Sequence, residues 1–242
     1  MEREISCSKC SQSCVGKVPI FQSLFEDDMN LISSLIRKRQ YRKGQVLFRE
    51  GENVDALCFV HYGNVKLSKI TIEGKEQILN ILSNGDFFGE LNVLQKVSSN
   101  FSAYALEDTE VCMLLRKDFE MVIQMYPNIS LKLLQEMTGR LAHAENLVQT
   151  LATKDAEVRL ANLILDFSEK YGRKTTNGIE ITLPMTREEM ANYIGVTRET
   201  ISRKLNKFED YGFIHANGNK SLVIEKIDRL NDFIKKWPSS SN

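Results

Sequence analysis

The spacing of apolar residues changes along the chain, and each change predicts a different kind of element. Residues 26–39 place Met29, Ile32, Leu35 and Ile36 on one face, which predicts a first helix. From Tyr41 to Leu115 the pattern becomes short apolar segments separated by glycines. Predicted strands are 46–48, 56–62, 65–72, 77–82, 102–106 and 111–115. Since no helix intervenes, we expect antiparallel pairing in a β-barrel or jelly roll of about eight strands.

A long helix is predicted at residues 129–153, after a short one at 119–126. Its apolar residues recur at alternating spacings of three and four: Leu134, Met137, Leu141, Ala144, Val148 and Leu151. Such a heptad repeat is typical of a parallel two-stranded dimer interface. The alternative is a helix packed on its own roll. The polar flanks Gln135, Arg140, His143 and Asn146 favour the dimer.

The segment 186–208, TREEMANYIGVTRETISRKLNKF, predicts two short helices with a tight turn between them. It follows a predicted helix at 155–171, a polar loop at 173–178 and a strand at 179–183. Thr186 and Glu189 match a capping box, and Thr197 can cap the second helix. Gly195 falls at the turn, where a positive φ costs glycine nothing.

The outer face of the second helix carries polar residues at its N-terminal end. Val196, Ile201 and Leu205 face inward, which leaves Arg198, Glu199, Ser202 and Arg203 outside. These are the positions that enter a major groove in a helix-turn-helix. An αα-hairpin with a solvated charged face is the alternative. Asn217-Gly218, between two apolar runs, predicts a β-hairpin next and therefore a winged helix.

Composition limits where positive charge for nucleic acid could lie. The chain has 242 residues and a formal net charge of zero, so any basic surface must be local. From Arg187 to Lys207 five basic residues oppose three acidic ones, a net charge of two (5 − 3) that dimerisation would double. There is neither a membrane-length apolar run nor a signal-peptide core, so we expect a cytoplasmic protein without a membrane partner.

Three of the five cysteines, Cys7, Cys10 and Cys14, fall in a polar segment at residues 1–18. This arm shows neither helical nor strand periodicity, and we expect it to lack fixed structure without a ligand. Structural disulfides are not expected in a cytoplasmic protein. The clustering therefore indicates chemistry rather than cross-linking.

The order of these elements resembles the cyclic AMP receptor protein (CRP)/fumarate–nitrate reduction regulator (FNR) family. The resemblance begins near Pro19, and its motifs are GDFFGEL at 85–91 and VTRETISR at 196–203. It implies an α+β fold: arm 1–18, antiparallel β-roll 19–128, dimerisation helix 129–153 and winged helix-turn-helix 154–238. It also implies a homodimer that binds a palindromic double-stranded DNA site and contacts RNA polymerase, rather than an enzyme.

Cyclic AMP is not the expected signal. The CRP branch holds the cyclic phosphate with an Arg-Ser pair, and Phe101-Ser102 stands there in this chain. Phenylalanine cannot supply the bidentate charged contact of arginine.

The resemblance implies that the cysteines are ligands of an iron–sulfur cluster. In the FNR branch three arm cysteines and a fourth in the roll ligate an oxygen-labile 4Fe-4S cluster, and the matching residues are Cys7, Cys10, Cys14 and Cys112. The best-known members have five residues between the second and third arm cysteines, whereas this chain has three. A four-thiolate zinc site, a metal-free thiol–disulfide switch and unligated thiols remain alternatives. We interpret Cys58 as a buried core residue.

The predicted recognition helix also indicates what it reads. Glu199 can accept from a cytosine amino group, Arg203 can pair with guanine, and Ser202 can contact a base edge or a thymine methyl. Glu-x-x-Ser-Arg resembles the FNR-branch motif for TTGA-type half-sites, whereas Arg198 resembles CRP and could shift the preference toward TGTGA. We expect the sugar–phosphate backbone of the DNA to be contacted by Thr186, Arg187 and Thr197.

The alternative to a DNA-binding regulator is an enzyme, a metal-dependent oxygenase built on a β-roll. It needs inward-facing histidine and carboxylate ligands. The three histidines, His61, His143 and His215, fall in three different predicted parts, the roll, the long helix and the wing. A two-histidine site is therefore not expected.

Overall fold

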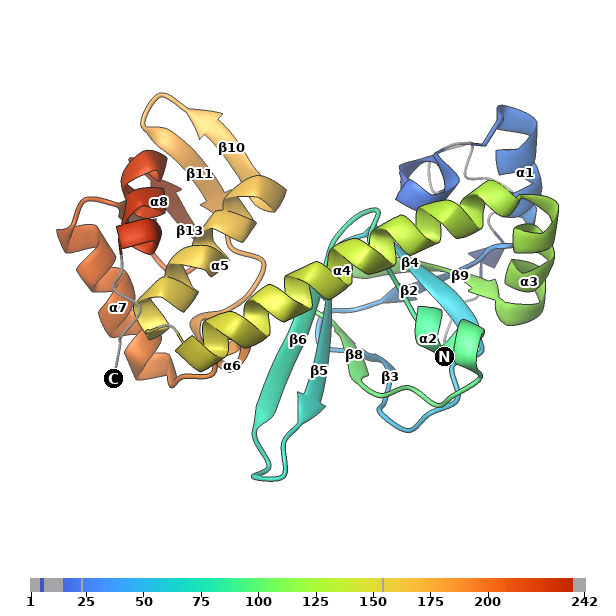
Figure 1. The fold of residues 1–242 in the computed structure, drawn as a ribbon, viewed down its shortest axis with the longest axis horizontal. Coiled ribbons are helices and arrows are strands. Elements are labelled where there is room, and N and C mark those ends of the chain that lie inside the picture. Colours follow the sequence, from blue (N-terminus) through green and yellow to red (C-terminus); the bar gives the residue numbers. More distant parts are fainter. Residues whose placement is uncertain (1–4, 7–14, 23, 154, 237–242) are drawn as a thin grey trace. The chain divides into compact units, whose positions relative to one another are not determined.

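The computed structural model describes residues 5–6, 15–22, 24–153 and 155–236 (Figure 1). The chain forms two compact units, Met1–Leu141 and Ala142–Asn242. Their boundary falls inside one long helix, α4 (Pro127–Thr153). Pro127 stands at its start, where a missing backbone N–H costs nothing. Among the described residues, no helix is both long enough and apolar enough to cross a bilayer.

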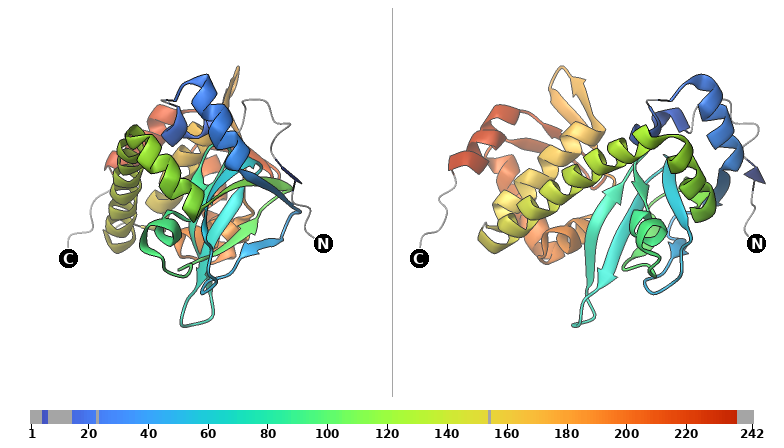
Figure 2. Two further views of the ribbon diagram at one scale, coloured as in Figure 1. Left: turned by 90° about the vertical axis from the view of Figure 1, so that its right-hand side faces the viewer. Right: turned by 45° about the vertical axis from the view of Figure 1, so that its right-hand side comes forward.

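The first unit is built on two antiparallel sheets, which confirms the predicted roll (Figures 1 and 2). The five-stranded sheet has the order β1-β2-β9-β4-β7, and the four-stranded sheet has the order β3-β8-β5-β6. The strands are β1 (Ile5–Ser6), β2 (Arg37–Tyr41), β3 (Val46–Phe48), β4 (Ala56–Tyr62), β5 (Val65–Ile70), β6 (Glu76–Leu82), β7 (Phe87–Phe88), β8 (Ser102–Ala105) and β9 (Thr109–Leu115).

The five-stranded sheet buries both of its faces. Val111 on β9 belongs to the apolar cluster between the two sheets, whereas Cys112 and Leu114 belong to a second cluster on the outer face. This alternation follows from the two-residue period of a strand. The outer cluster also takes residues from α1 (Glu26–Leu35), α3 (Arg116–Met125), α4 and the 3-10 turns Val15–Lys17 and Pro19–Phe21.

The GDFFGEL motif forms a tight passage into the short helix α2 (Glu90–Gln95). Gly89 has φ 87°, and a Cβ there would lie 2.7 Å from the backbone oxygen of Ala56. Gly85 has φ 93°, and a Cβ there would lie 2.9 Å from the oxygen of Lys17. The motif therefore needs glycine both for its backbone conformation and for the close approach of neighbouring chain.

The second unit is a small sheet flanked by helices. Antiparallel strands β10 (Gly172–Thr175), β11 (Gly178–Thr182), β13 (Ser221–Ile224) and β12 (Ile214–Asn217) lie side by side in that order. The helices are α5 (Ala156–Tyr171), α6 (Arg187–Ile194), α7 (Arg198–Asp210) and α8 (Ile227–Lys236). Phe208, Phe213 and Phe233 form a ring cluster with centroids 5.6 to 5.8 Å apart.

Three sequence predictions are wrong in detail. The first helix ends at Leu35 rather than 39, because Ile36 is already extended and the charged segment Arg37–Tyr41 pairs as β2. The predicted loop 173–178 begins with strand β10, whose four residues are all exposed and so show no apolar alternation. The arm is not without secondary structure up to residue 18. Ile5–Ser6 forms a strand, and Val15 is buried in a 3-10 turn.

The close approach at Gly89 gives a stability prediction. Gly89→Ala adds a methyl against Ala56 O and also strains a positive-φ residue, so we expect it to lower the free energy of unfolding by about 2–5 kcal/mol. Gly44 has φ 80° but open space around its Cβ position. Gly44→Ala should therefore cost only about 1 kcal/mol. Urea unfolding followed by circular dichroism measures both. Equal losses would show that the contact at Gly89 is unimportant.

Candidate nucleic-acid interface and cysteine site

Helices α6 and α7 form the predicted helix-turn-helix, and their capping is as expected. The Glu189 N–H donates to Thr186 Oγ1 at 3.3 Å, and the Thr186 N–H donates to Glu189 Oε2 at 2.8 Å. Gly195 ends α6 with φ 72°. The Thr200 N–H then donates to Thr197 Oγ1 at 3.3 Å and caps α7. Both helix starts are therefore fixed locally by their own side chains.

The outer face of α7 presents the predicted reading residues. Arg198, Glu199 and Arg203 are exposed, and Ser202 is half-buried. Arg187 Nη1 donates to Ser202 Oγ at 3.3 Å, so the structure brings these two predicted contacts together. Hydrogen bonds from its own backbone N–H and from the Thr197 hydroxyl hold the pKa of Glu199 below its usual value. Glu199 is therefore a carboxylate, and an acceptor, at neutral pH.

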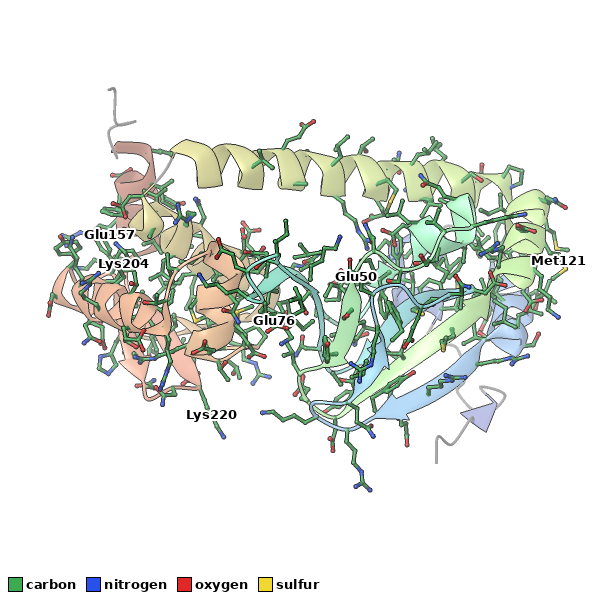
Figure 3. The ribbon with its side chains drawn as sticks, turned by 90° about the horizontal axis from the view of Figure 1, so that it is seen from below. Glu50, Glu76, Met121, Glu157, Lys204 and Lys220 are labelled. Atoms are coloured by element: carbon green, nitrogen blue, oxygen red, sulfur yellow. The ribbon has the colours of Figure 1, made fainter. Side chains whose placement is uncertain are left out.

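A β-hairpin follows α7, as the Asn217-Gly218 pair predicted. Asn217 pairs with Ser221, so the turn comprises residues 218–220 and Asn217 is the last residue of β12. Gly218 has φ 68° and supplies the left-handed position. The exposed side chain of Lys220 projects from this turn (Figure 3). The unit thus has the helix-turn-helix and wing of a winged helix.

Two of the basic residues counted from the sequence form ion pairs with acidic residues at the start of α5. Lys204 Nζ lies 3.2 Å from both Asp155 Oδ1 and Glu157 Oε1, and Lys207 Nζ lies 2.8 Å from Glu157 Oε1. Figure 3 shows Lys204 next to Glu157. Of the three arginines in the segment, Arg198 and Arg203 are exposed. The sequence held one signal of this pairing. Glu157 falls on the buried stripe of α5 with Leu160 and Ile164.

The end of α6 is held by a contact that the sequence did not reveal. Arg159 Nε on α5 donates to the Ile194 carbonyl at 2.9 Å. Cations near a helix C-terminus stabilise the unpaired carbonyls there. Helix α5 therefore supports both helices of the motif.

Of the four predicted thiolate ligands, the structure places Cys112. Its side chain is buried in the outer cluster with Val15 and Val18 and with Ile129 and Leu133 of α4. Cys7, Cys10 and Cys14 lie outside the described residues. Cys58 faces the other cluster, between the sheets, and burial raises the pKa of its thiol to about 12. Cys58 is thus an inert core residue, as predicted.

The described residues on either side of segment 7–14 lie near Cys112, in the five-stranded sheet and in the outer cluster. In the five-stranded sheet Ile5 pairs with Lys38, and Lys38 pairs with Cys112. Cys7 therefore follows a strand that lies two places from Cys112. On the other side, Cys14 precedes Val15, which shares the apolar cluster of Cys112. Four cysteine thiolates are a donor set of the kind that holds an iron–sulfur cluster.

A polar network on β2, β4 and β9 adjoins Cys112. Glu110 forms an ion pair with Lys38 and accepts from Gln40 Nε2 at 2.7 Å, and His61 Nε2 lies 3.9 Å from it. Burial alone would raise the pKa of Glu110, but the hydrogen bonds from Lys38 and Gln40 outweigh burial and lower it. Within the described part of the chain, no three histidine, cysteine or acidic side chains gather as a metal site.

Part of the predicted dimer seam is exposed on α4. Leu134, Leu141 and Val148, spaced seven residues apart, are 62%, 60% and 67% exposed. Ala144 is exposed too, whereas Met137 packs against the outer cluster of its own unit. The side chain of Leu151 is not described. The seam is therefore an apolar strip on one helix, with Met137 turned toward the roll.

The interior of the roll is apolar where the CRP branch holds a phosphate. The Phe101 ring packs 5.7 Å from the Phe48 ring, and Ser102 Oγ accepts the Glu50 N–H at 3.0 Å. Glu90 of the GDFFGEL motif instead meets Arg140 of α4, with Nη1 and Oε1 3.2 Å apart. Arg140 also donates to the Phe87 carbonyl at 2.5 Å. This corner of the roll is thus tied to α4 by the chain's own side chains.

A β-roll, a long helix and a winged helix-turn-helix, in this order, define a class of DNA-binding transcription regulators. A family model described as "Cyclic nucleotide-binding domain" matches residues 38–126, and one described as "Crp-like helix-turn-helix domain" matches residues 158–233. The chain belongs to the CRP/FNR family of transcription regulators.

Relatives agree along nearly the whole chain. The "Probable transcriptional regulator flp" of Lacticaseibacillus casei is 30% identical over 92% of this chain and 99% of its own length. The "Fumarate and nitrate reduction regulatory protein" of Escherichia coli (strain K12) is 31% identical over 93% of this chain and 89% of its own. FixK2 from Bradyrhizobium japonicum superposes with a TM-score of 0.73 at 28% identity, covering 81% and 95% of the two chains. These relatives are regulators rather than enzymes.

The cap of α5 gives a pH-dependent prediction. The Glu157 N–H donates to Asp155 Oδ1 at 2.8 Å and, with Lys204, lowers the pKa of Asp155. A carboxyl with a lowered pKa stabilises the fold above its unfolded pKa of about 3.9 and loses that contribution as pH falls through its folded pKa.

Asp155→Asn keeps a capping side chain but removes the charge. We expect it to lower the melting temperature at pH 7, and we expect the difference from wild type to close below about pH 4. Asp155→Ala also loses the cap, so its free energy of unfolding should remain about 1 kcal/mol below that of wild type in acid. Circular dichroism melts at several pH values measure both. A difference that is constant with pH would contradict the electrostatic account.

Proposed function

We propose that this regulator senses oxygen or redox state through a 4Fe-4S cluster held by Cys7, Cys10, Cys14 and Cys112. The observation that carries the proposal is the position of Cys112. It shares one apolar cluster with Val15, at the end of the arm, and with Leu133 of α4. A change at this cysteine therefore acts on the same apolar cluster that contains residues of α4, the helix with the dimer seam.

The bound cluster supplies an oxygen-labile centre, by resemblance to the FNR branch. The protein's part is mechanical. With all four thiolates engaged, segment 7–14 is fastened to β9, and the outer cluster is packed against α4. Release of the arm cysteines loosens that packing. A shift of the population between two states requires the engaged state to be favoured by a few kcal/mol, on the order of 5 kcal/mol for near-complete switching.

The exposed strip on α4 supports homodimerisation. Leu134, Leu141 and Val148 repeat with the heptad period, and the same residues of a second copy can cover them in a parallel two-stranded coil. Dimerisation sets two α7 helices about one DNA turn apart on a palindromic site. A change at the outer cluster thus reaches DNA through the spacing of two reading helices.

Base reading is assigned to α7. Arg203 pairs with guanine, Glu199 accepts from cytosine, and Ser202 contacts a base edge. Arg198 extends the preference from TTGA toward TGTGA half-sites or binds phosphate, and Thr186, Arg187 and Thr197 contact the backbone. By resemblance to the family, the DNA-bound dimer contacts RNA polymerase. Cyclic AMP is not its signal, because Phe101 and Ser102 are engaged within the roll.

Replacing the roll cysteine tests the sensor. We expect Cys112→Ser to abolish oxygen-dependent binding to a duplex with two inverted TTGA half-sites, because one of four thiolates is lost. Cys58→Ser, a buried control on the other face of the sheet, should keep the dependence. Anaerobic and aerobic gel-shift titrations measure both.

The same experiment separates the alternatives. Oxygen dependence that survives in Cys112→Ser, but is reversed by a thiol reductant, would place the switch in the arm cysteines alone. One zinc per chain with no dependence on oxygen would indicate a structural metal site.

The reading residues give a second prediction. Arg203→Gln should weaken binding to the TTGA duplex by about 1–3 kcal/mol and relax the preference for guanine at that position. Arg198→Gln should reduce any preference for TGTGA over TTGA if Arg198 reads a base. A uniform loss on every duplex would identify Arg198 as a phosphate contact. Fluorescence anisotropy with single-base variants of the duplex provides the affinities.

A further inference from the structure

Two acidic residues at the start of α5 hold two lysines of the recognition helix. Glu157 Oε1 lies 3.2 Å from Lys204 Nζ and 2.8 Å from Lys207 Nζ. Asp155 Oδ1 lies 3.2 Å from Lys204 Nζ. The side chains of Glu157 and Lys204 are only 8% and 13% exposed. A carboxylate this buried is costly without a cation, so the two helices are held in one arrangement.

The position of the two lysines on α7 means that their ion pairs with Glu157 and Asp155 affect DNA binding. Lys207 follows Arg203 by four residues and so lies one turn further along the same side of the helix. Its side chain remains 43% exposed, and its ammonium also lies 5.5 Å from the centre of the Tyr211 ring. A flexible lysine beside a reading arginine would ordinarily be available to a phosphate. Here its charge is directed to Glu157 instead.

We propose that Glu157 is a positioning residue that limits the phosphate contacts of α7. It holds Lys204 and Lys207 against α5, so that α7 offers DNA its reading residues without two further phosphate-seeking cations. Phosphate contacts strengthen binding to every sequence alike, whereas base contacts discriminate. Withholding the two lysines therefore lowers the affinity for DNA of any sequence and the salt dependence of that affinity. The proposal rests on DNA binding by α7 but on neither the cysteines nor a particular half-site.

The salt dependence of binding to a scrambled duplex tests this directly. Glu157→Gln removes the charge that holds the lysines. We expect its slope of log K against log salt to steepen by about 0.9 for each lysine that reaches a phosphate. Its affinities for the scrambled and the specific duplex at low salt should rise by a similar factor. Glu169→Gln makes the same change in net charge at an exposed position on α5 and should leave the slope unchanged.

A second variant decides the matter even if Glu157→Gln is poorly folded. Lys207→Gln removes a half-exposed side chain, and we expect it to leave the wild-type slope unchanged, because Lys207 does not contact phosphate. A slope flatter by about 0.9 would show that Lys207 already binds DNA and would overturn the proposal. In the double variant Glu157→Gln/Lys207→Gln, part of the steepening should disappear.

The outcomes also separate this proposal from the proposed half-site. A wild-type protein without preference for the TTGA duplex would contradict the predicted reading motif only, since the slopes are measured on scrambled DNA. A folded Glu157→Gln protein with the wild-type slope would overturn the role of Glu157.

Discussion

The apolar cluster on the outer face of the five-stranded sheet is the constraint on which the first unit depends. It joins three parts of the chain that are far apart in sequence: Val15 after the arm, Cys112 on β9 and Leu133 on α4. Close packing makes such a core sensitive to small changes in the volume or position of its members. A chemical event at Cys112 can therefore not be absorbed locally. It has to be accommodated by the arm, by the sheet or by the helix.

The second unit depends on buried charge rather than on apolar packing alone. Glu157 and Arg159, both on α5, hold α7 through Lys204 and Lys207 and hold α6 through the Ile194 carbonyl. Because these contacts have fixed partners and directions, they orient the reading helix more specifically than apolar contacts would. They also determine which cations remain for DNA. The two lysines of the helix-turn-helix segment are ion-paired with Glu157, whereas Arg198 and Arg203 are exposed.

Local signals in the sequence predicted most of the fold. The capping box at Thr186 and Glu189, the cap at Thr197, the turn at Gly195 and the hairpin after α7 each depend on a few adjacent residues, and the structure confirms them. Errors arose where a strand carries few apolar residues. Arg37–Tyr41 and Gly172–Thr175 show no apolar alternation, since neighbouring strands rather than side-chain burial fix them. The pairing of Glu157 with two lysines about fifty residues away was hidden for the same reason: partners distant in sequence leave no periodic pattern. Only the charge on a buried stripe indicated it.

The account's central claim is that the four cysteines hold an iron–sulfur cluster whose state controls DNA binding. Its most direct test is anaerobic purification of the full chain, with iron and sulfide analysis and a visible spectrum before and after exposure to air. The account predicts about four irons and four sulfides per chain, and a brown chromophore that air bleaches as affinity for the TTGA duplex falls. A colourless, iron-free protein that binds its site equally well in air would contradict it.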